Sequence, residues 1–179
     1  MTSVIVPDSR AGWDAEVGHL PFHPDQLPAV LAMLGRCSRE TLFMRFHGAT
    51  DGTVHALDLA RRYDHWTLGA WNGPDCVGLA TLALGEGSND LGVLVEDAWQ
   101  RRGIGTVLLR DLADLAGASG ITDLQAEVLA DNRWVLKVLA RIGAIDATTR
   151  WGAYSVTVRV MSPARTTELG RQHVGHSCG

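Results

Sequence analysis

The chain has 179 residues, of which 46% are hydrophobic, so it is long enough for one domain with a core of its own. Its net charge of -4 comes from 16 basic and 20 acidic residues, which excludes a broad basic surface for nucleic acid or for an anionic membrane. Its three cysteines lie far apart without a CxxC pair, which argues against a disulfide framework or a zinc ribbon. Without a signal-peptide pattern or an apolar run near the ~18 residues of a membrane span, we expect a cytoplasmic protein.

The first half of the chain predicts three short helices followed by a hairpin of two strands. Helical spacing of apolar residues marks the first two helices, and Ser38 is the expected N-cap of the second. The period then changes to that of strands, and the letters NGPD between them are turn formers. We expect helices at 23–35, 38–48 and 53–62 and strands at 65–71 and 76–84.

The second half of the chain alternates strands and helices. Short apolar runs bounded by turn residues are separated by longer segments with helical spacing. The predicted elements are a strand at 91–95, a helix at 103–120, a strand at 122–130, a helix at 132–143 and a strand at 151–160. The whole pattern indicates a mixed α/β sheet that is antiparallel early and has one strand-helix-strand crossover later.

Residues 99–105, WQRRGIG, place two arginines and two glycines directly before and inside the start of the predicted crossover helix. The free N–H groups of the first helical turn point back over this loop. Gly103 and Gly105 let a ligand approach those amides, and Arg101 and Arg102 add positive charge. Together these features suit a phosphate or a pyrophosphate.

Two nucleotide motifs do not fit this loop, whereas an acyl-CoA motif does. Leu108 stands where a dinucleotide fingerprint has its third glycine, and no GKS or GKT follows. QRRGIG, Gln100 to Gly105, resembles the Q/R-x-x-G-x-G/A acyl-CoA loop of the GNAT family of N-acetyltransferases. VLADNRWVLKVLARIGA resembles that family's next strand and helix, with Asn132 at the helix start. The segment at 21–48 is similar to the opening of the bacterial protein-lysine acetyltransferase type.

The resemblance implies the GNAT fold over about residues 20–160. This fold is a mixed, mostly antiparallel α/β sheet with a parallel splayed strand pair and flanking helices. In the family, a bulge in the strand before the loop helps to open that pair. The implied organisation is an N-terminal extension at 1–18, an acyl-CoA N-acyltransferase domain at 19–161, and a tail at 162–179 that we expect to be mobile because it has little to bury.

The resemblance also implies acetyl-CoA as a cosubstrate and no metal. Pyrophosphate would lie on the amides of the loop, and the pantetheine arm would pair with the backbone of the strand at 91–95. Asn132 would hydrogen-bond the arm or a phosphate, while a helix N-cap is its alternative or additional role. The implied binding residues are Val93, Val95, Gln100, Arg101, Arg102, Gly103, Ile104, Gly105, Thr106 and Asn132.

The implied reaction is direct attack of an amine on the thioester. An ammonium with a pKa of about 10.4 must first lose a proton, so a carboxylate, often acting through water, is the expected base. Asp90 is the first candidate because the protein-lysine type carries a glutamate at this point, and Glu127 is the second. Glu127 could instead be a buried charge paired with an arginine, and the base could be neither. A backbone N–H near Val95 would stabilise the oxyanion, and Leu139 replaces the family's acid tyrosine, so no acid is assigned.

Several alternatives stay open at the level of sequence. The acceptor could be a protein lysine or a small-molecule amine, and the chain could form a homodimer. Instead of an enzyme, the chain could be a non-catalytic acyl-CoA-binding regulatory module. We expect no nucleic-acid or membrane partner, and His173, His176 and Cys178 lack the fourth ligand and the scaffold of a metal site.

Overall fold

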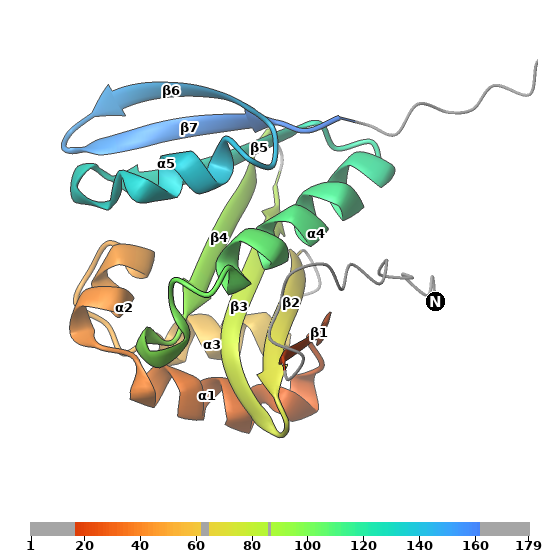
Figure 1. Ribbon diagram of the computed structural model, residues 1–179, viewed down its shortest axis with the longest axis vertical. Helices are drawn as coiled ribbons and strands as arrows, with labels where there is room; N and C mark the ends of the chain where they lie inside the picture. Colours follow the sequence, from red (N-terminus) through yellow and green to blue (C-terminus); the bar gives the residue numbers. More distant parts are fainter. Residues whose placement is uncertain (1–16, 62–64, 86, 162–179) are drawn as a thin grey trace, which may run out of the picture.

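The computed structural model describes residues 17–61, 65–85 and 87–161, and these form one seven-stranded sheet with helices on both faces (Figure 1). The strands are β1 (Val17–Pro21), β2 (His65–Asn72), β3 (Asp75–Leu84), β4 (Asn89–Val95), β5 (Asp123–Leu129), β6 (Ala144–Arg150) and β7 (Ala153–Arg159). The helices are α1 (Leu27–Arg36), α2 (Arg39–Phe46), α3 (Thr53–Arg61), α4 (Ile104–Ala118) and α5 (Trp134–Leu139), with short 3-10 helices η1 (Pro24–Gln26), η2 (Asp97–Trp99) and η3 (Ala130–Asn132).

The sheet has the order β1-β2-β3-β4-β5-β7-β6 and is antiparallel except at one pair. β4 and β5 run parallel and pair in the sheet only at Asp90 and Gln125, beside which Asn89 hydrogen-bonds to Gln125 and Asp123, and the strands then separate. This arrangement confirms the predicted mixed sheet with a parallel, splayed pair. The expected bulge in β4 is wrong, because Asn89–Val95 pair with β3 without a register shift, and the sheet's irregularity lies at Ala70/Trp71 between β2 and β3.

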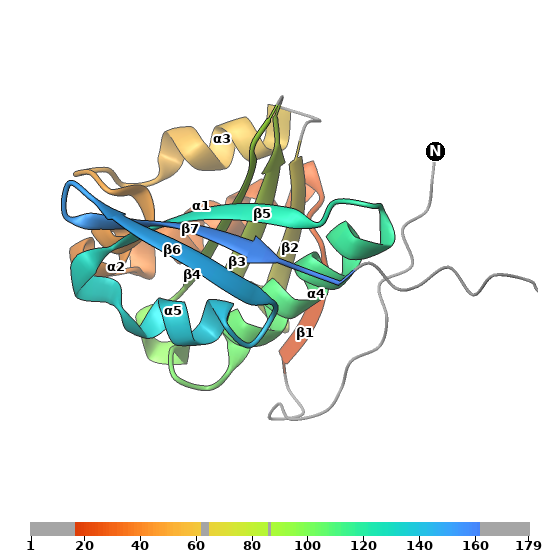
Figure 2. The ribbon, with the colours of Figure 1, turned by 90° about the horizontal axis from the view of Figure 1, so that it is seen from above.

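Two layers of helices enclose the sheet. α4 and α5 lie on one face, and α1, α2 and α3 lie on the other (Figures 1 and 2). Each layer has its own buried cluster, with Leu108 and Leu112 beneath α4 and Met33 beneath α1. Because side chains alternate along a strand, β4 sends Leu91 into the first cluster and Leu94 into the second. β4 therefore separates two chemically distinct sides of the molecule.

The predicted helices and strands are all present, with shifted ends. Ser38 caps α2 as predicted, because its side chain accepts a hydrogen bond from the first turn at 3.1 Å. α2 ends at Phe46, two residues earlier than predicted, because His47 adopts a left-handed conformation with φ of 55°. α5 starts only at Trp134, since residues 130–132 form η3 instead.

Two strands escaped the sequence prediction, and both lie at the edges of the sheet. All seven residues of β6 are exposed, so this strand has no alternation of buried and exposed residues to detect. β1 has five residues and begins at Val17, two residues before the predicted start of the domain. Among the described residues, no helix is long and apolar enough to cross a membrane.

Candidate acyl-CoA and acceptor site

The turn before α4 presents backbone amides at one end of β4. Gly103 is the N-cap of α4, with φ of 87°. Its carbonyl accepts hydrogen bonds from the amides of Thr106 and Val107 at 3.0 and 3.1 Å. The amides of Ile104 and Gly105 precede these and have no acceptor within the helix. The predicted phosphate cradle thus contains amides that can serve a ligand, while the amide of Thr106 is already engaged.

Close packing does not explain either glycine of this turn. A Cβ at Gly103 would meet nothing within 4 Å, so the positive φ rather than crowding favours glycine there. A Cβ at Gly105 would lie 3.5 Å from Val93 Cγ2 and from Val95 Cγ2, which is ordinary contact. The packing therefore does not require a glycine at position 105, and a methyl group would fit there.

A network of hydrogen bonds fastens the loop after β4 to the start of α2. Asp97 Oδ2 accepts from the Ser38 amide at 2.8 Å, and Asp97 Oδ1 accepts from Ser38 Oγ at 2.7 Å and from Thr41 Oγ1 at 2.8 Å. Burial acts to raise the pKa of Asp97, but the hydrogen bonds from Ser38 and Thr41 outweigh it and hold the pKa below its usual value. α2 and the predicted acyl-CoA loop are thereby fixed relative to each other.

Two of the three predicted ligand-binding side chains in this loop, those of Gln100 and Arg102, have partners within the protein. Gln100 Nε2 lies 3.1 Å from both the Val95 carbonyl and Thr41 Oγ1, so this side chain braces the loop. The guanidinium of Arg102 lies over the ring of Trp99, with 4.7 Å from Cζ to the ring centroid. Arg101 is exposed, with φ of 60°. The contacts of these three side chains with acyl-CoA stay predictions.

The edge of β4 that faces β5 is open beyond its single paired residue. The amide of Glu96 donates to the Val77 carbonyl of β3 at 3.0 Å. Because backbone groups alternate in direction along a strand, those of Val93 and Val95 point the other way, toward β5. β5 does not pair with either of them. An extended ligand could therefore bind to this edge, as a peptide adds to a sheet.

A cavity of about 70 Å³ lies in the gap between β4 and β5. Val93 from β4, Glu127 from β5 and Asn132 from η3 line it, together with Arg45 from α2. Leu139 from α5 is another wall and is only 2% exposed. The structure thus brings three predicted site residues, Val93, Glu127 and Asn132, to one cleft with Leu139, which stands at the position of the family's acid tyrosine. It adds Arg45, to which the sequence analysis assigned no role.

Asn132 is not the N-cap of the following helix. That position belongs to Arg133, whose side chain makes no capping hydrogen bond. Asn132 ends η3, and its side chain has no hydrogen-bond partner among the described residues. The N-cap alternative is therefore wrong, and the amide of Asn132 is available to a ligand in the cleft.

The two candidate bases lie on neighbouring strands. Asp90 is exposed at the start of β4 and accepts a hydrogen bond from Ser88 Oγ at 3.4 Å. Glu127 is exposed on β5 and has no arginine partner among the described residues, so the alternative of a buried, paired charge is wrong. Asp90 precedes Val93 by three residues, which corresponds to about 10 Å along a strand. Action of Asp90 near Val93 would therefore require a chain of water molecules.

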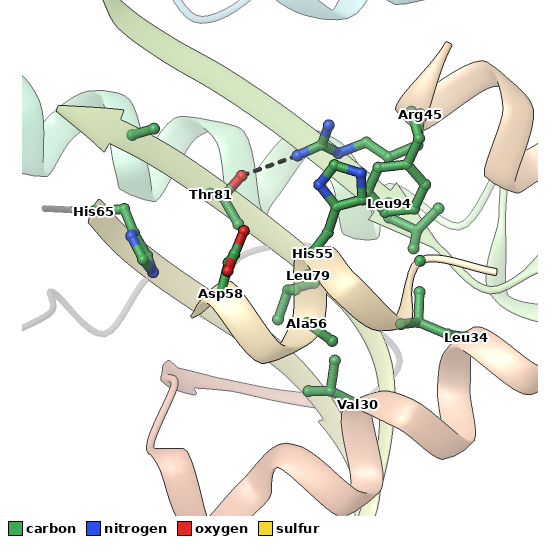
Figure 3. Close-up of a pocket in the computed structure, with 13 residues that line it drawn as sticks. Val30, Leu34, Arg45, His55, Ala56, Asp58, His65, Leu79, Thr81 and Leu94 are labelled. Atoms are coloured by element: carbon green, nitrogen blue, oxygen red, sulfur yellow. Dashed lines mark hydrogen bonds between the residues drawn. The ribbon is translucent and has the colours of Figure 1, made fainter. Parts of the chain in front are cut away.

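A second and larger cavity, of about 200 Å³, lies over β3 and β4 on the face covered by α1, α2 and α3 (Figure 3). Its wall includes Ala83, the cross-strand partner of Asp90, so Asp90 lies at its margin. Arg45 lines this cavity as well as the cleft between β4 and β5. The remaining walls are Val30, Leu34, Phe46, Gly52, His55, Ala56, Asp58, His65, Leu79, Thr81 and Leu94.

Comparison of the sequence with known families gives one match that spans this whole arrangement. The profile of the acetyltransferase (GNAT) family matches residues 33–144, which is more than half of the chain. The chain belongs to the GNAT family. The matched region contains α2, the loop before α4, the open edge of β4 and η3. The predicted class of acyl-CoA-dependent N-acetyltransferase is thereby confirmed at the level of the family.

Solved structures of GNAT proteins share the fold of this chain. The GNAT domain of PAT from S. lividans superimposes with a TM-score of 0.72 at 22% identity, covering 79% of this chain and 89% of that one. The PaiA N-acetyltransferase from Thermoplasma acidophilum, in complex with coenzyme A, gives 0.62 at 13% identity, with coverages of 80% and 98%. The spermidine N-acetyltransferase from Vibrio cholerae, in complex with CoA and spermine, gives 0.61 at 9% identity, with coverages of 80% and 95%.

Cysteine chemistry and metal binding find no support in the described part of this GNAT protein. Cys76 is buried, with its Sγ 3.6 Å from Met33 Sδ, and burial raises the pKa of its thiol to about 12. Burial and the nearby charge of Asp97 likewise raise the pKa of the Cys37 thiol to about 12. Neither thiol is a thiolate near neutral pH. No group of metal ligands occurs among the described residues, and the tail cluster at 173–178 lies outside them.

Proposed function

We propose that this GNAT protein transfers an acetyl group from acetyl-CoA to a primary amine by direct attack in a ternary complex. The observation that carries the proposal is the open edge of β4, which leads into the amide-rich start of α4. Acetyl-CoA would lie along that edge, and the acceptor would enter from the larger cavity on the other face. The two would meet near Gly92 and Arg45, where the cleft and the cavity adjoin.

The phosphate end of acetyl-CoA would bind at the turn before α4. The amides of Ile104 and Gly105 would donate hydrogen bonds to the pyrophosphate, with help from the positive end of the α4 dipole. Arg101 and Arg102 are exposed beside this turn, and they would add charge-assisted contacts to the phosphates. Arg102 would contact the phosphates either from its present position over the ring of Trp99 or after leaving that ring.

The pantetheine arm would continue along β4 toward the reacting centre. Its amide groups would pair with the backbone of Val93 and Val95, and Asn132 would reach it from the opposite wall of the cleft. Pairing at Val95 competes with Gln100, whose side chain now donates to the Val95 carbonyl. Such pairing would bring the thioester to the point where the strands diverge.

The acetyl transfer itself needs a free amine and a stabilised oxyanion. The amine nitrogen attacks the thioester carbon, its proton passes to the base, and the carbon–sulfur bond breaks to release the thiolate of CoA, which takes a proton. Asp90 would serve as the base through water, with Glu127 as the second candidate. A backbone amide of β4 would hold the oxyanion, and Val93 lies closer to the proposed meeting point at Gly92 than Val95, the position expected from the sequence. Leu139 is apolar and buried, so the protonation of the thiolate would rely on solvent.

Release of CoA from acetyl-CoA in the presence of a panel of amines tests the proposal. The panel would contain lysine-bearing peptides, polyamines and small amino compounds, since the structure supports the amine class more firmly than one acceptor. Amine-dependent release of CoA, with an acetylated product, is the expected result. Tight CoA binding without transfer to any amine would instead favour the non-catalytic acyl-CoA-binding module.

A further inference from the structure

Arg45 lies between the two cavities and faces both of them. Its Nη2 donates a hydrogen bond to Thr81 Oγ1 of β3 at 3.1 Å (Figure 3). Its guanidinium lies over the ring of Phe46, 5.1 Å from the centroid, and against Gly92 of β4. A Cβ at position 92 would overlap the guanidinium, so Gly92 makes room for this group. Three elements thus hold one cation at the place where the acyl donor and the acceptor would meet.

No carboxylate in the described part of the chain balances this cation. The acidic residues that line the two cavities, Asp58 and Glu127, form no ion pair with Arg45, and neither does any other described residue. Burial accordingly lowers the pKa of the Arg45 guanidinium. A guanidinium has five N–H donors, and Thr81 accepts only one hydrogen bond. Because desolvating an unpaired charge is costly, a ligand that supplies an anion gains most at this position.

The anion would come with the acceptor rather than with acetyl-CoA. The phosphates of CoA would lie at the far end of β4, at the start of α4, and the pantetheine arm carries no negative charge. The larger cavity, by contrast, opens from Arg45 onto apolar walls such as Val30, Leu79 and Leu94 (Figure 3). Its volume of about 200 Å³ fits the body of a small molecule. An acceptor with a carboxylate at Arg45 would therefore place its apolar part in this cavity.

We propose that Arg45 is the carboxylate-binding residue of the acceptor site, and that the acceptor is a small primary amine that carries a carboxylate. The inference rests on the proposed function and names its substrate class. A carboxylate can engage a guanidinium through two parallel hydrogen bonds, which would fix the orientation of the acceptor. The nearby positive charge would also favour the neutral form of the attacking amine over its ammonium form.

Matched pairs of acceptors test this assignment. We would measure kcat/KM for L-leucine, L-methionine and 6-aminohexanoate, each beside its carboxamide, in the wild type and in Arg45→Met. The ratio of acid to amide should fall at least about tenfold in the variant, since hydrogen bonds between charged groups are among the strongest in proteins. Comparing ratios between proteins cancels the different reactivities of the two amines. Arg39→Met, which removes an exposed arginine from the same helix, is the control and should leave the ratio unchanged.

Two further measurements keep the assignment separate from the proposed function. Gly92→Ala would displace the guanidinium without removing its charge, and it should lower the same ratio even if Arg45→Met folds poorly. Calorimetry on the CoA-saturated protein should show that at least one acid binds about tenfold more tightly than its amide, whether or not turnover occurs. Equal losses for acids and amides in Arg45→Met would overturn the assignment while leaving the N-acetyltransferase proposal intact. Wild-type protein that binds no acid more tightly than its amide would also overturn it.

Discussion

Substitutions at Gly105 separate the stability of the fold from the binding of acyl-CoA. Gly105→Ala places a methyl group 3.5 Å from Val93 Cγ2 and from Val95 Cγ2, without a clash and without a positive φ. Because glycine costs a helix about 0.5–1 kcal/mol relative to alanine, this variant should gain up to that amount of unfolding free energy. For a chain of this size, such a gain raises the melting temperature by roughly 1–4 °C.

Gly105→Glu should weaken the binding of CoA. Its carboxylate would stand where the phosphates of CoA are expected, so it would repel them and block the amides of the turn. Since a hydrogen bond to a charged group is worth about 1.5–3 kcal/mol, the loss of one such bond should weaken CoA by roughly 10- to 100-fold. Calorimetry with CoA measures the affinity, and thermal unfolding verifies that both variants are folded. A folded Gly105→Glu protein with the wild-type Kd for CoA would refute the placement of the phosphates.

Three further predictions concern charged residues. Asp90→Asn should lower turnover by roughly 10²-fold while changing CoA affinity only a few-fold. The loss of turnover should shrink at high pH, where the free amine forms without a base. A wild-type rate in this variant beside a nearly inactive Glu127→Gln would transfer the role of the base to Glu127. Alanine at Arg101 or at Arg102 should weaken CoA more than dephospho-CoA in at least one case, and equal losses at every ionic strength would exclude the 3'-phosphate as their target. Because the pKa of Asp97 is lowered in the folded protein, its carboxylate stabilises the fold above the unfolded value of about 3.9, and this stabilisation is lost as the pH falls through the lower, folded value. Asp97→Asn should therefore melt below the wild type at pH 7, and the difference between the two melting temperatures should shrink in acid.

The sequence predicted the fold well wherever a segment is buried on one side. The apolar spacing within α4 and the turn letters NGPD are local signals, and the elements that they indicate are present. β6 gave no such signal, because both of its faces are exposed. β1 is a short edge strand whose pairing with β2 depends on tertiary contacts. Edge strands are thus the part of this fold that local patterns did not reveal.

The candidate site likewise has a part that local sequence patterns revealed and a part that they did not. The loop at 99–105 could be interpreted from sequence because its arginines, glycines and helix start are contiguous. Arg45 could not be assigned, because its environment is assembled from Thr81 and Gly92, which lie on two other elements far along the chain. The choice between an N-cap and a ligand contact for Asn132 likewise depended on where α5 begins.

The most direct test of the account is mass spectrometry of the acceptor after incubation with acetyl-CoA labelled with ¹³C in the acetyl group. The account predicts an acetylated amine that carries the label, formed in a one-to-one ratio with free CoA, and strongly reduced formation in Gly105→Glu. An acceptor that stays unlabelled while the protein binds CoA tightly, across peptide, polyamine and carboxylate-bearing amines, would contradict it.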